Sequence, residues 1–377
     1  MENKNTFLAA ISTPLASIFG SGFLVMVPIL VGAVGAYAIY GILLITFMAY
    51  NVGNVIRYNI KHVEPLLETS TPKVTLYLEK TASFSLILAY IVSISLYLHI
   101  LSAFVLTGLA VDTDFNEDIL TSSIIVLITL IAIIKGLKAL EVLEKYALAI
   151  TLVIVFALIV SFFMYDLNIY LSPLAFTMPK ALEHSTTEIF AILAGMLIVV
   201  QGFETSRYLG HSYSAELRIK TSKYSQLFST AVYVVFITLS LPIAYLLQGQ
   251  YDDHSLITLV SLTASFMVVP LIVVAALSQF SAAVADTLAA SGGIEEVSDA
   301  RIGKVTSYLL IALFAIVITW SVHTLEIIAL ASRAFALYYL LQTFVAISVS
   351  KKFLEKIYFS ILALLLLAIT LFAIPVG

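Results

Sequence analysis

The sequence predicts an all-α polytopic membrane protein with about eleven transmembrane helices. Hydrophobic residues make up 61% of the 377 residues and charged residues only 11%, and the mean hydropathy is +1.06. A soluble domain averages about a quarter charged residues. Apolar runs of about 20 residues, the length that crosses a bilayer, recur along the whole chain and leave only short loops. This composition excludes an ordinary water-soluble enzyme.

The individual crossings are predicted from apolar runs that end at charged or turn residues. In chain order they are residues 8–31, 33–56, 82–108, 119–134, 146–165, 187–208, 224–247, 257–287, 304–321, 325–349 and 357–375.

The basic residues predict how these crossings are oriented. With the N-terminus in the cytoplasm, all but two of the 19 Lys and Arg residues fall in inner segments. The two others are Lys180, in an outer loop, and Arg333, within a crossing. Acidic clusters at 112–118 and 252–253 fall outside. This pattern follows the positive-inside rule and predicts a multi-pass protein of the plasma (inner) membrane, surrounded by the lipid bilayer.

Two crossings contain residues that interrupt a helix. The first carries Gly20-Ser21-Gly22 in its middle, and the sixth carries Gln201-Gly202-Phe203-Glu204. Glycine is a poor helix former, and unpaired backbone within a bilayer is tolerated only where it lines a cavity or meets a ligand. We therefore predict that the first and sixth helices are broken. Close packing of small residues is the alternative interpretation.

The two predicted breaks lie five crossings apart, which is the spacing expected for inverted repeats. The sequence is accordingly divided into a first repeat at residues 1–165, an extracellular connection at 166–184, a second repeat at 185–349 and an accessory helix at 350–377.

Three short motifs resemble one family of transporters. The stretch 17–24, Ser-Ile-Phe-Gly-Ser-Gly-Phe-Leu, followed by Pro28, is similar to the first-helix signature of the amino acid-polyamine-organocation (APC) superfamily. Residues 202–204 resemble its sixth-helix motif, and 136–138 resemble the start of its fifth helix. The resemblance implies a leucine-transporter-type fold, with five-plus-five inverted repeats, and secondary transport of small organic solutes. The chain departs from the family at 215–220, where a Glu-x-x-x-Pro segment is absent, and in lacking a twelfth helix.

Charged residues inside the crossings are candidates for function, because each costs about 2.5 to 3.5 kcal/mol at mid-membrane. Glu204, beside the sixth-helix break, is expected to bind a cation or an ammonium group, to relay a proton, or to act as a structural tie. Arg333 lies two helical turns from Glu326 on the same face, which predicts a structural or gating salt bridge. His99 is a proton-relay candidate or a hydrogen-bonded packing residue. Asp286, near the inner end of the eighth crossing, is an ion ligand or a helix-end group.

The resemblance also implies where ligands bind. The substrate site would be formed by Gly20, Ser21 and Gly22 facing residues 201–204, with free backbone amides suited to a substrate carboxylate. A Na⁺ site would use the carbonyls of Ile18 and Ser21, with Ala275 and the hydroxyl of Ser278, and Ser281 as a further candidate. Oxygen ligands suit a hard cation. Because Thr151 stands where proton-coupled relatives carry a lysine, Na⁺ is favoured over H⁺.

The sequence contains no metal-binding spacing, Walker-type loop or nucleophile elbow. We therefore expect neither catalysis nor nucleic-acid binding, and no cofactor beyond a coupling ion. The predicted function is cation-coupled secondary active transport of an amino acid or related small organic solute by alternating access. The alternative is a ligand-sensing receptor subunit, as in the germinant-receptor relatives, which binds a solute without sustained transport.

Overall fold

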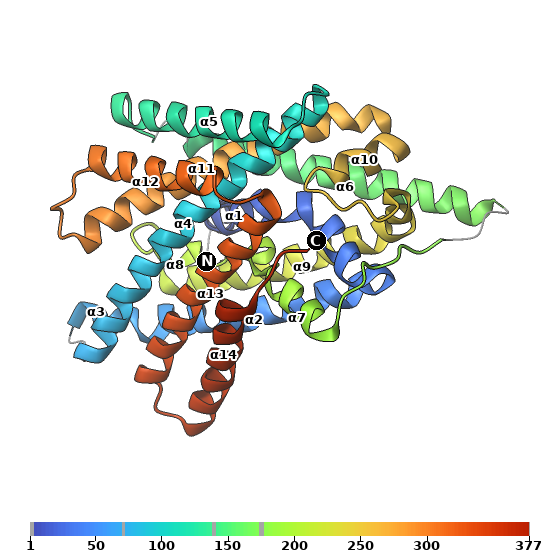
Figure 1. Cartoon of the computed structure of the whole chain (residues 1–377). Helices are drawn as coiled ribbons and strands as arrows, with labels where there is room; N and C mark the ends of the chain where they lie inside the picture. Colours follow the sequence, from blue (N-terminus) through green and yellow to red (C-terminus); the bar gives the residue numbers. More distant parts are fainter. Residues whose placement is uncertain (1–3, 70–71, 138–140, 173–176, 377) are drawn as a thin grey trace.

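The computed structural model describes residues 4–69, 72–137, 141–172 and 177–376, with the backbone alone at positions 4, 5, 21, 68 and 141–145. All regular secondary structure within these residues is helical (Figure 1). The all-α fold is therefore confirmed.

The first half of the chain forms six α-helices. They are α1 (Lys4–Val34), α2 (Ala38–His62), α3 (Glu64–Thr69), α4 (Lys73–Gly108), α5 (Asp114–Ile134) and α6 (Glu141–Leu171), with a 3₁₀ turn, η1 (Gly35–Tyr37), before α2. Local sequence explains several ends. Thr113 caps α5 by accepting a hydrogen bond from the backbone N of Asn116, and Pro72 stands directly before α4, where its missing N–H is not needed.

The second half begins with an interrupted helix. Its elements are α7 (Thr186–Ala194), η3 (Leu197–Val200), α8 (Thr205–Tyr208), α9 (Ala215–Ala244), η4 (Tyr245–Leu247), α10 (Ser255–Thr263), η5 (Ser265–Met267), α11 (Val268–Val297), α12 (Lys304–Thr319), α13 (Thr324–Val349) and α14 (Phe353–Phe372). Ser185 and Glu188 form a capping box at the start of α7.

Eight helical stretches of the described residues are long and apolar enough to cross a membrane, judged by length and composition alone. The outer part of α1 and the whole of α2 count together as one of these stretches. The helix α12 is apolar but is not among the eight, because it has only 16 residues. The sixth predicted crossing is the interrupted run α7–η3–α8. Each of the eleven predicted crossings overlaps a helix or this run, which fits a multi-pass membrane protein.

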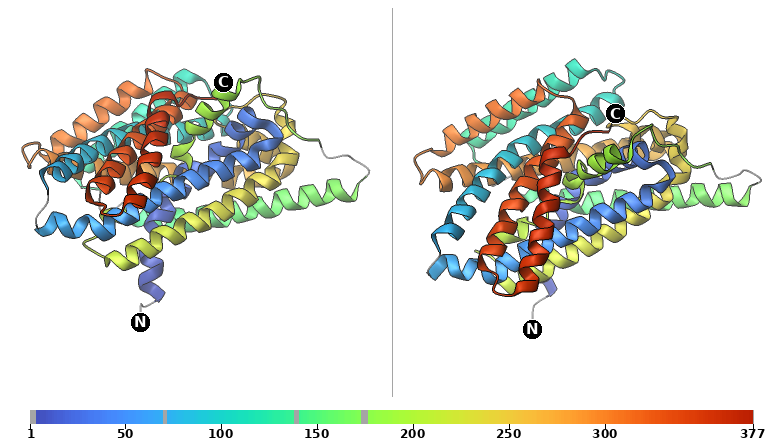
Figure 2. Two further views of the ribbon diagram at one scale, coloured as in Figure 1. Left: turned by 90° about the horizontal axis from the view of Figure 1, so that it is seen from below. Right: turned by 60° about the horizontal axis from the view of Figure 1, so that its bottom comes forward.

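The helices pack around α4, which contacts both α11 and α13 along its length. On the other side of α11, α1 packs against α9 and α6. The pair α5 and α12 lies on one flank, and α14 covers α13 (Figure 1). The far end of α6 extends beyond the other helices (Figure 2) and runs past the predicted repeat boundary at 165 to Leu171. The division into two repeats stays a prediction.

The predicted break in the first helix is wrong, because α1 is one continuous α-helix. A Cβ atom on Gly22 would lie 2.0 Å from the carbonyl oxygen of Val199. Glycine is therefore present so that η3 can approach the helix backbone closely, which is the packing interpretation. Since a continuous helix engages its backbone amides internally, they are not available to a substrate carboxylate.

The predicted break in the sixth helix is confirmed. The helix stops at Ala194, and Gln201 is extended. Gly202 has φ +124°, and a Cβ atom there would lie 2.7 Å from the backbone N of Ile18. Both the backbone angle and the contact with α1 require glycine at this position.

The predicted eighth crossing, 257–287, is wrong in its bounds. The chain bends at Ala264, so α10 is separate, and α11 starts only at Val268 and continues to Val297. Two adjacent glycines, 292 and 293, weaken the helix signal without ending the helix. Asp286 consequently lies well inside α11, not near its inner end.

Candidate functional site

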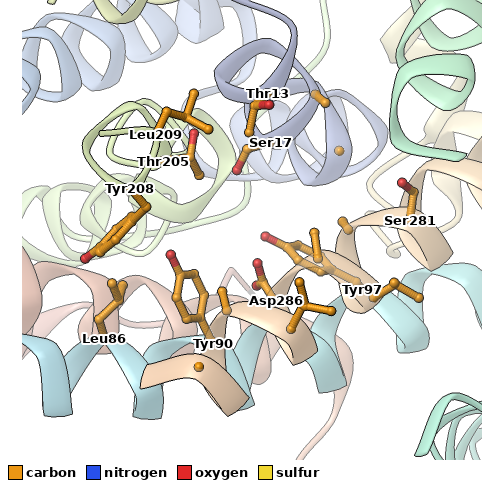
Figure 3. Close-up of a pocket in the computed structure, with 18 of the residues that line it drawn as sticks. Thr13, Ser17, Leu86, Tyr90, Tyr97, Thr205, Tyr208, Leu209, Ser281 and Asp286 are labelled. Carbon is orange, nitrogen blue, oxygen red and sulfur yellow. The ribbon is translucent and has the colours of Figure 1, made fainter. Parts of the chain in front are cut away.

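A cavity of about 860 Å³ lies between α1, α4, α6, α8 and α11 (Figure 3). Its deep end reaches Phe19, Tyr97 and Ser278, which lie well inside their helices. Its other end reaches Ser83, in the early part of α4, and Glu296, in the last turn of α11. In the orientation predicted from the basic residues, these two helix ends lie at the cytoplasmic face, and the cavity opens toward that side.

Polar side chains line opposite walls of this cavity. Asp286 on α11 points into the space beside Tyr90 and Tyr97 of α4, while Thr205 and Ser17 lie across from it (Figure 3). The hydroxyl of Ser93 donates a hydrogen bond to the Asp286 carboxylate. This hydrogen bond orients the carboxylate in the cavity wall.

The outer side of the molecule is closed above the cavity. The backbone N of Leu182 donates to the carbonyl of Gly32 over 2.8 Å, and the hydroxyl of Tyr251 donates to the carbonyl of Lys180 over 2.7 Å. The loop before α7 is therefore fastened across the outer end of α1. In the predicted orientation, this conformation is inward-facing.

The residues predicted to bind substrate are only partly brought to the cavity. Gly20 lines it. Gly22 and residues 201–204 lie outside its lining, although Gln201 donates to the hydroxyl of the lining Tyr97 over 3.3 Å. The side chain of Ser21 lies outside the described residues.

Glu204 is buried behind the cavity wall, with 1% of its surface exposed. One carboxylate oxygen accepts hydrogen bonds from the backbone N of Gly202, at 2.9 Å, and from the hydroxyl of Tyr339, at 2.8 Å. The Phe203 ring stacks on Tyr339 at 5.5 Å between centroids. These contacts fasten the helix break to α13, so they favour the structural tie among the predicted roles of Glu204.

The groups proposed to hold Na⁺ have protein partners. The hydroxyl of Tyr233 donates to the Ile18 carbonyl over 2.7 Å, and Ser278 donates to the Ala275 carbonyl over 3.2 Å. The carbonyl of Gly20, which was not among the predicted ligands, accepts from the side-chain amide of Gln279. Ser278 and Ser281 line the cavity, whereas Ile18 and Ala275 are buried behind it. The Na⁺ site stays a prediction.

The predicted salt bridge between Arg333 and Glu326 is wrong. Glu326 accepts a hydrogen bond from the backbone N of His323, because a Glu at this position completes the cap of α13. Arg333 instead donates to the carbonyl of Thr370, at 3.1 Å, and to that of Leu371. A positive side chain at the carbonyl end of α14 is electrostatically favourable.

His99 is enclosed in a hydrogen-bonded pair. It is 2% exposed, and its Nε2 lies 3.1 Å from a carboxylate oxygen of Asp118 on α5. Its Nδ1 lies 3.1 Å from the Ser95 carbonyl. With both ring nitrogens engaged, the geometry favours the packing role over the proton relay.

A buried polar network at the cytoplasmic side was missed by the sequence analysis, which counted its bases as loop residues. Arg207 lies 2.8 Å from Glu79 and also contacts Gln342. Arg218 lies 2.6 Å from Glu64. The partners come from distant parts of the chain, so no local pattern points to them.

One family model matches almost the whole chain. A family model described as an APC superfamily transporter matches residues 1–373. A relative from Aquifex aeolicus (strain VF5), described as an uncharacterized protein, is 38% identical over 371 residues, which cover 97% of this chain and 89% of the relative.

Two solved structures share the fold. A manganese transporter of Eremococcus coleocola, in complex with an aromatic bis-isothiourea compound, has a TM-score of 0.59 at 12% identity. A single-site mutant of the same transporter has a TM-score of 0.55 at 10% identity. Both alignments cover 97% of this chain and 86% of the other. At this level of identity the likeness concerns the fold alone.

Proposed function

The chain belongs to the APC superfamily of transporters, and from this premise we propose that it moves a small amino-bearing organic solute by alternating access. The solute would be an amino acid or an amine of similar size. The observation that carries the proposal is the inward-facing cavity with the Asp286 carboxylate in its wall.

The size of the cavity supports a solute of this class. A volume of about 860 Å³ lies within the range of about 300 to 1,000 Å³ that small-ligand sites occupy. Tyr90 and Tyr97 beside Asp286 offer hydroxyl groups and aromatic faces, both of which attract an ammonium group. The backbone amides of the continuous α1 are engaged within the helix, so they offer a carboxylate no equivalent attraction.

The interrupted sixth helix supports alternating access. The outer half, α7, and the inner half, α8, are separated by residues 195–204, which include the extended Gln201 and the glycine at positive φ. Such a break allows two half-helices to move separately around a central site. The present conformation, closed outside and open inside, is one of the two that the mechanism requires.

We propose that a cation gradient drives transport and that H⁺ is favoured over Na⁺. Among the predicted Na⁺ ligands, the Ile18 carbonyl accepts a hydrogen bond from Tyr233, and the Ala275 carbonyl accepts one from Ser278. That these carbonyls already have protein partners supports a proton-linked mechanism. Asp286 would hold a proton or an ammonium group, one at a time. Solute and proton would then move in opposite directions.

Reconstituted protein in liposomes tests this function. Uptake of labelled amines and amino acids is measured with an imposed pH gradient, with a Na⁺ gradient, and with neither. We expect uptake to follow the pH gradient and to persist when choline replaces Na⁺. Dependence on Na⁺ alone would restore the predicted sodium site. A solute that binds without entering the liposomes would indicate the receptor function.

A further inference from the structure

The segment that follows α14 lies in the closed outer side of the molecule. Residues 373–376 leave the last turn of the helix and pack inward, where Ala373 and Val376 are buried. Ile374, Pro375 and Val376 border a very small gap. Its other walls come from α1, α7 and α13 and include Ile29, Ile192 and Ile328. We call residues 373–376 the strap.

The strap is bonded to the outer half of the broken helix. The backbone N of Ile374 donates to the carbonyl of Ala191 over 3.1 Å. A Cβ atom on Gly195 would lie only 2.5 Å from the carbonyl oxygen of Ile374. Glycine at the end of α7 therefore allows the strap backbone to lie directly against it.

Two further contacts connect the strap to the rest of the outer side. A Cβ atom on Gly32 would lie 3.0 Å from the side chain of Val376, so the strap reaches the outer end of α1. Arg333 of α13 holds the carbonyls of Thr370 and Leu371 at the end of α14. The base of the strap is thus fixed to α13, while its tip contacts α1 and α7.

We propose that the strap is a clasp that holds the outer side shut and so favours the inward-facing conformation. Opening the outer side requires α7 and the outer end of α1 to separate from α13. That separation breaks the Ile374–Ala191 hydrogen bond and exposes the apolar side chains around the strap. The clasp rests on the alternating access proposed above, but it concerns conformation and not the identity of the solute.

Because the chain contains no cysteine, a single introduced thiol reports on access to the cavity. Ser281 lines the cavity, and Ser281→Cys provides the reporter. Intact cells are treated with a membrane-impermeant thiol reagent, which labels the introduced thiol from outside only when the outer side opens. This measurement needs no transported solute, so loss of flux would not affect its interpretation.

Three changes in the Ser281→Cys background should release the clasp: deletion of residues 373–377, Ile374→Pro, which removes the backbone donor, and Gly195→Ala, whose Cβ displaces the strap. Each should speed labelling about fivefold, because one lost hydrogen bond is worth about 1 kcal/mol. Ile374→Val keeps the N–H group and a branched apolar side chain and is the matched control, with labelling close to the parent. Thermal unfolding in detergent confirms that each variant is folded. If the folded deletion variant is labelled no faster than the parent, the strap does not hold the outer side shut, whatever the point variants do.

Discussion

Two acidic side chains near the cavity have different surroundings and, in this account, different roles. Asp286 points into the cavity and receives a hydrogen bond from Ser93. Glu204 is buried outside the cavity lining and accepts two hydrogen bonds that fasten the break in the sixth helix. The sequence identified both as intramembrane carboxylates. It could not separate their roles, because hydrogen-bond partners such as Tyr339 are far away along the chain.

Asp286→Asn should reduce kcat/KM for amine uptake about tenfold or more, since about 1.4 kcal/mol of lost attraction is a tenfold change in affinity. The loss should be smaller for a neutral analogue of the same shape. Uptake assays in liposomes, with the parent protein as the reference, measure this difference. Equal losses for charged and neutral solutes would remove Asp286 from solute recognition.

Glu204→Gln and Glu204→Ala should behave differently. Glutamine keeps an oxygen that accepts from Gly202 and Tyr339, so stability and uptake should stay near those of the parent. Alanine leaves the buried backbone N–H of Gly202 without its partner and should lower the free energy of unfolding by about 1–3 kcal/mol. Thermal unfolding and uptake are measured together. A glutamine variant that is stable but inactive would assign Glu204 a direct part in transport.

At the scale of helices, the polar and apolar pattern predicted most elements. Two of the exceptions involve glycine, and a third is the bend at Ala264. The same residue type allows close packing at Gly22 and a true break at Gly202. The difference depends on which backbone lies opposite, η3 or α1, and that is a tertiary feature that local sequence does not contain. The bounds of α11 were missed for a related reason, since the glycine pair at 292–293 does not end the helix.

Gly22→Ala should lower the free energy of unfolding. The variant that remains folded should still bind solute. Its Cβ would collide with the Val199 carbonyl, and overpacking of this kind costs about 1–3 kcal/mol. Gly303→Ala is the control, because a Cβ atom there has no neighbour within 4 Å among the described residues. Thermal unfolding in detergent compares the two variants. A fully stable Gly22→Ala protein that no longer binds solute would return Gly22 to the substrate site.

At the scale of the whole molecule, the inward-facing arrangement combines a closed outer side with a cytoplasmic cavity and a polar network beside it. Composition predicted the multi-pass membrane architecture, and the orientation derived from the basic residues stays a prediction. The network of Arg207, Glu79 and Gln342 joins α8, α4 and α13. It was not predictable, because its members lie more than 100 residues apart and two of them resemble loop charges.

Arg207→Gln should destabilise the fold by about 3–5 kcal/mol, because it leaves the largely buried Glu79 carboxylate without its positive partner. The double variant Arg207→Gln with Glu79→Gln should recover part of that loss. A double-mutant cycle of thermal unfolding measures the coupling. If the two single variants lose stability additively in the double variant, the Arg207–Glu79 ion pair has no coupling energy of its own.

The central claim, that solute crosses the membrane through this cavity, is tested most directly by counterflow in liposomes. Liposomes loaded with unlabelled amine should transiently accumulate labelled amine without any ion gradient. Ala285→Trp, which fills the cavity wall, should abolish this accumulation, whereas Leu364→Trp, on the exposed surface of α14, should leave it intact. Accumulation that persists in a folded Ala285→Trp protein, or binding without any counterflow in the parent, would contradict the account.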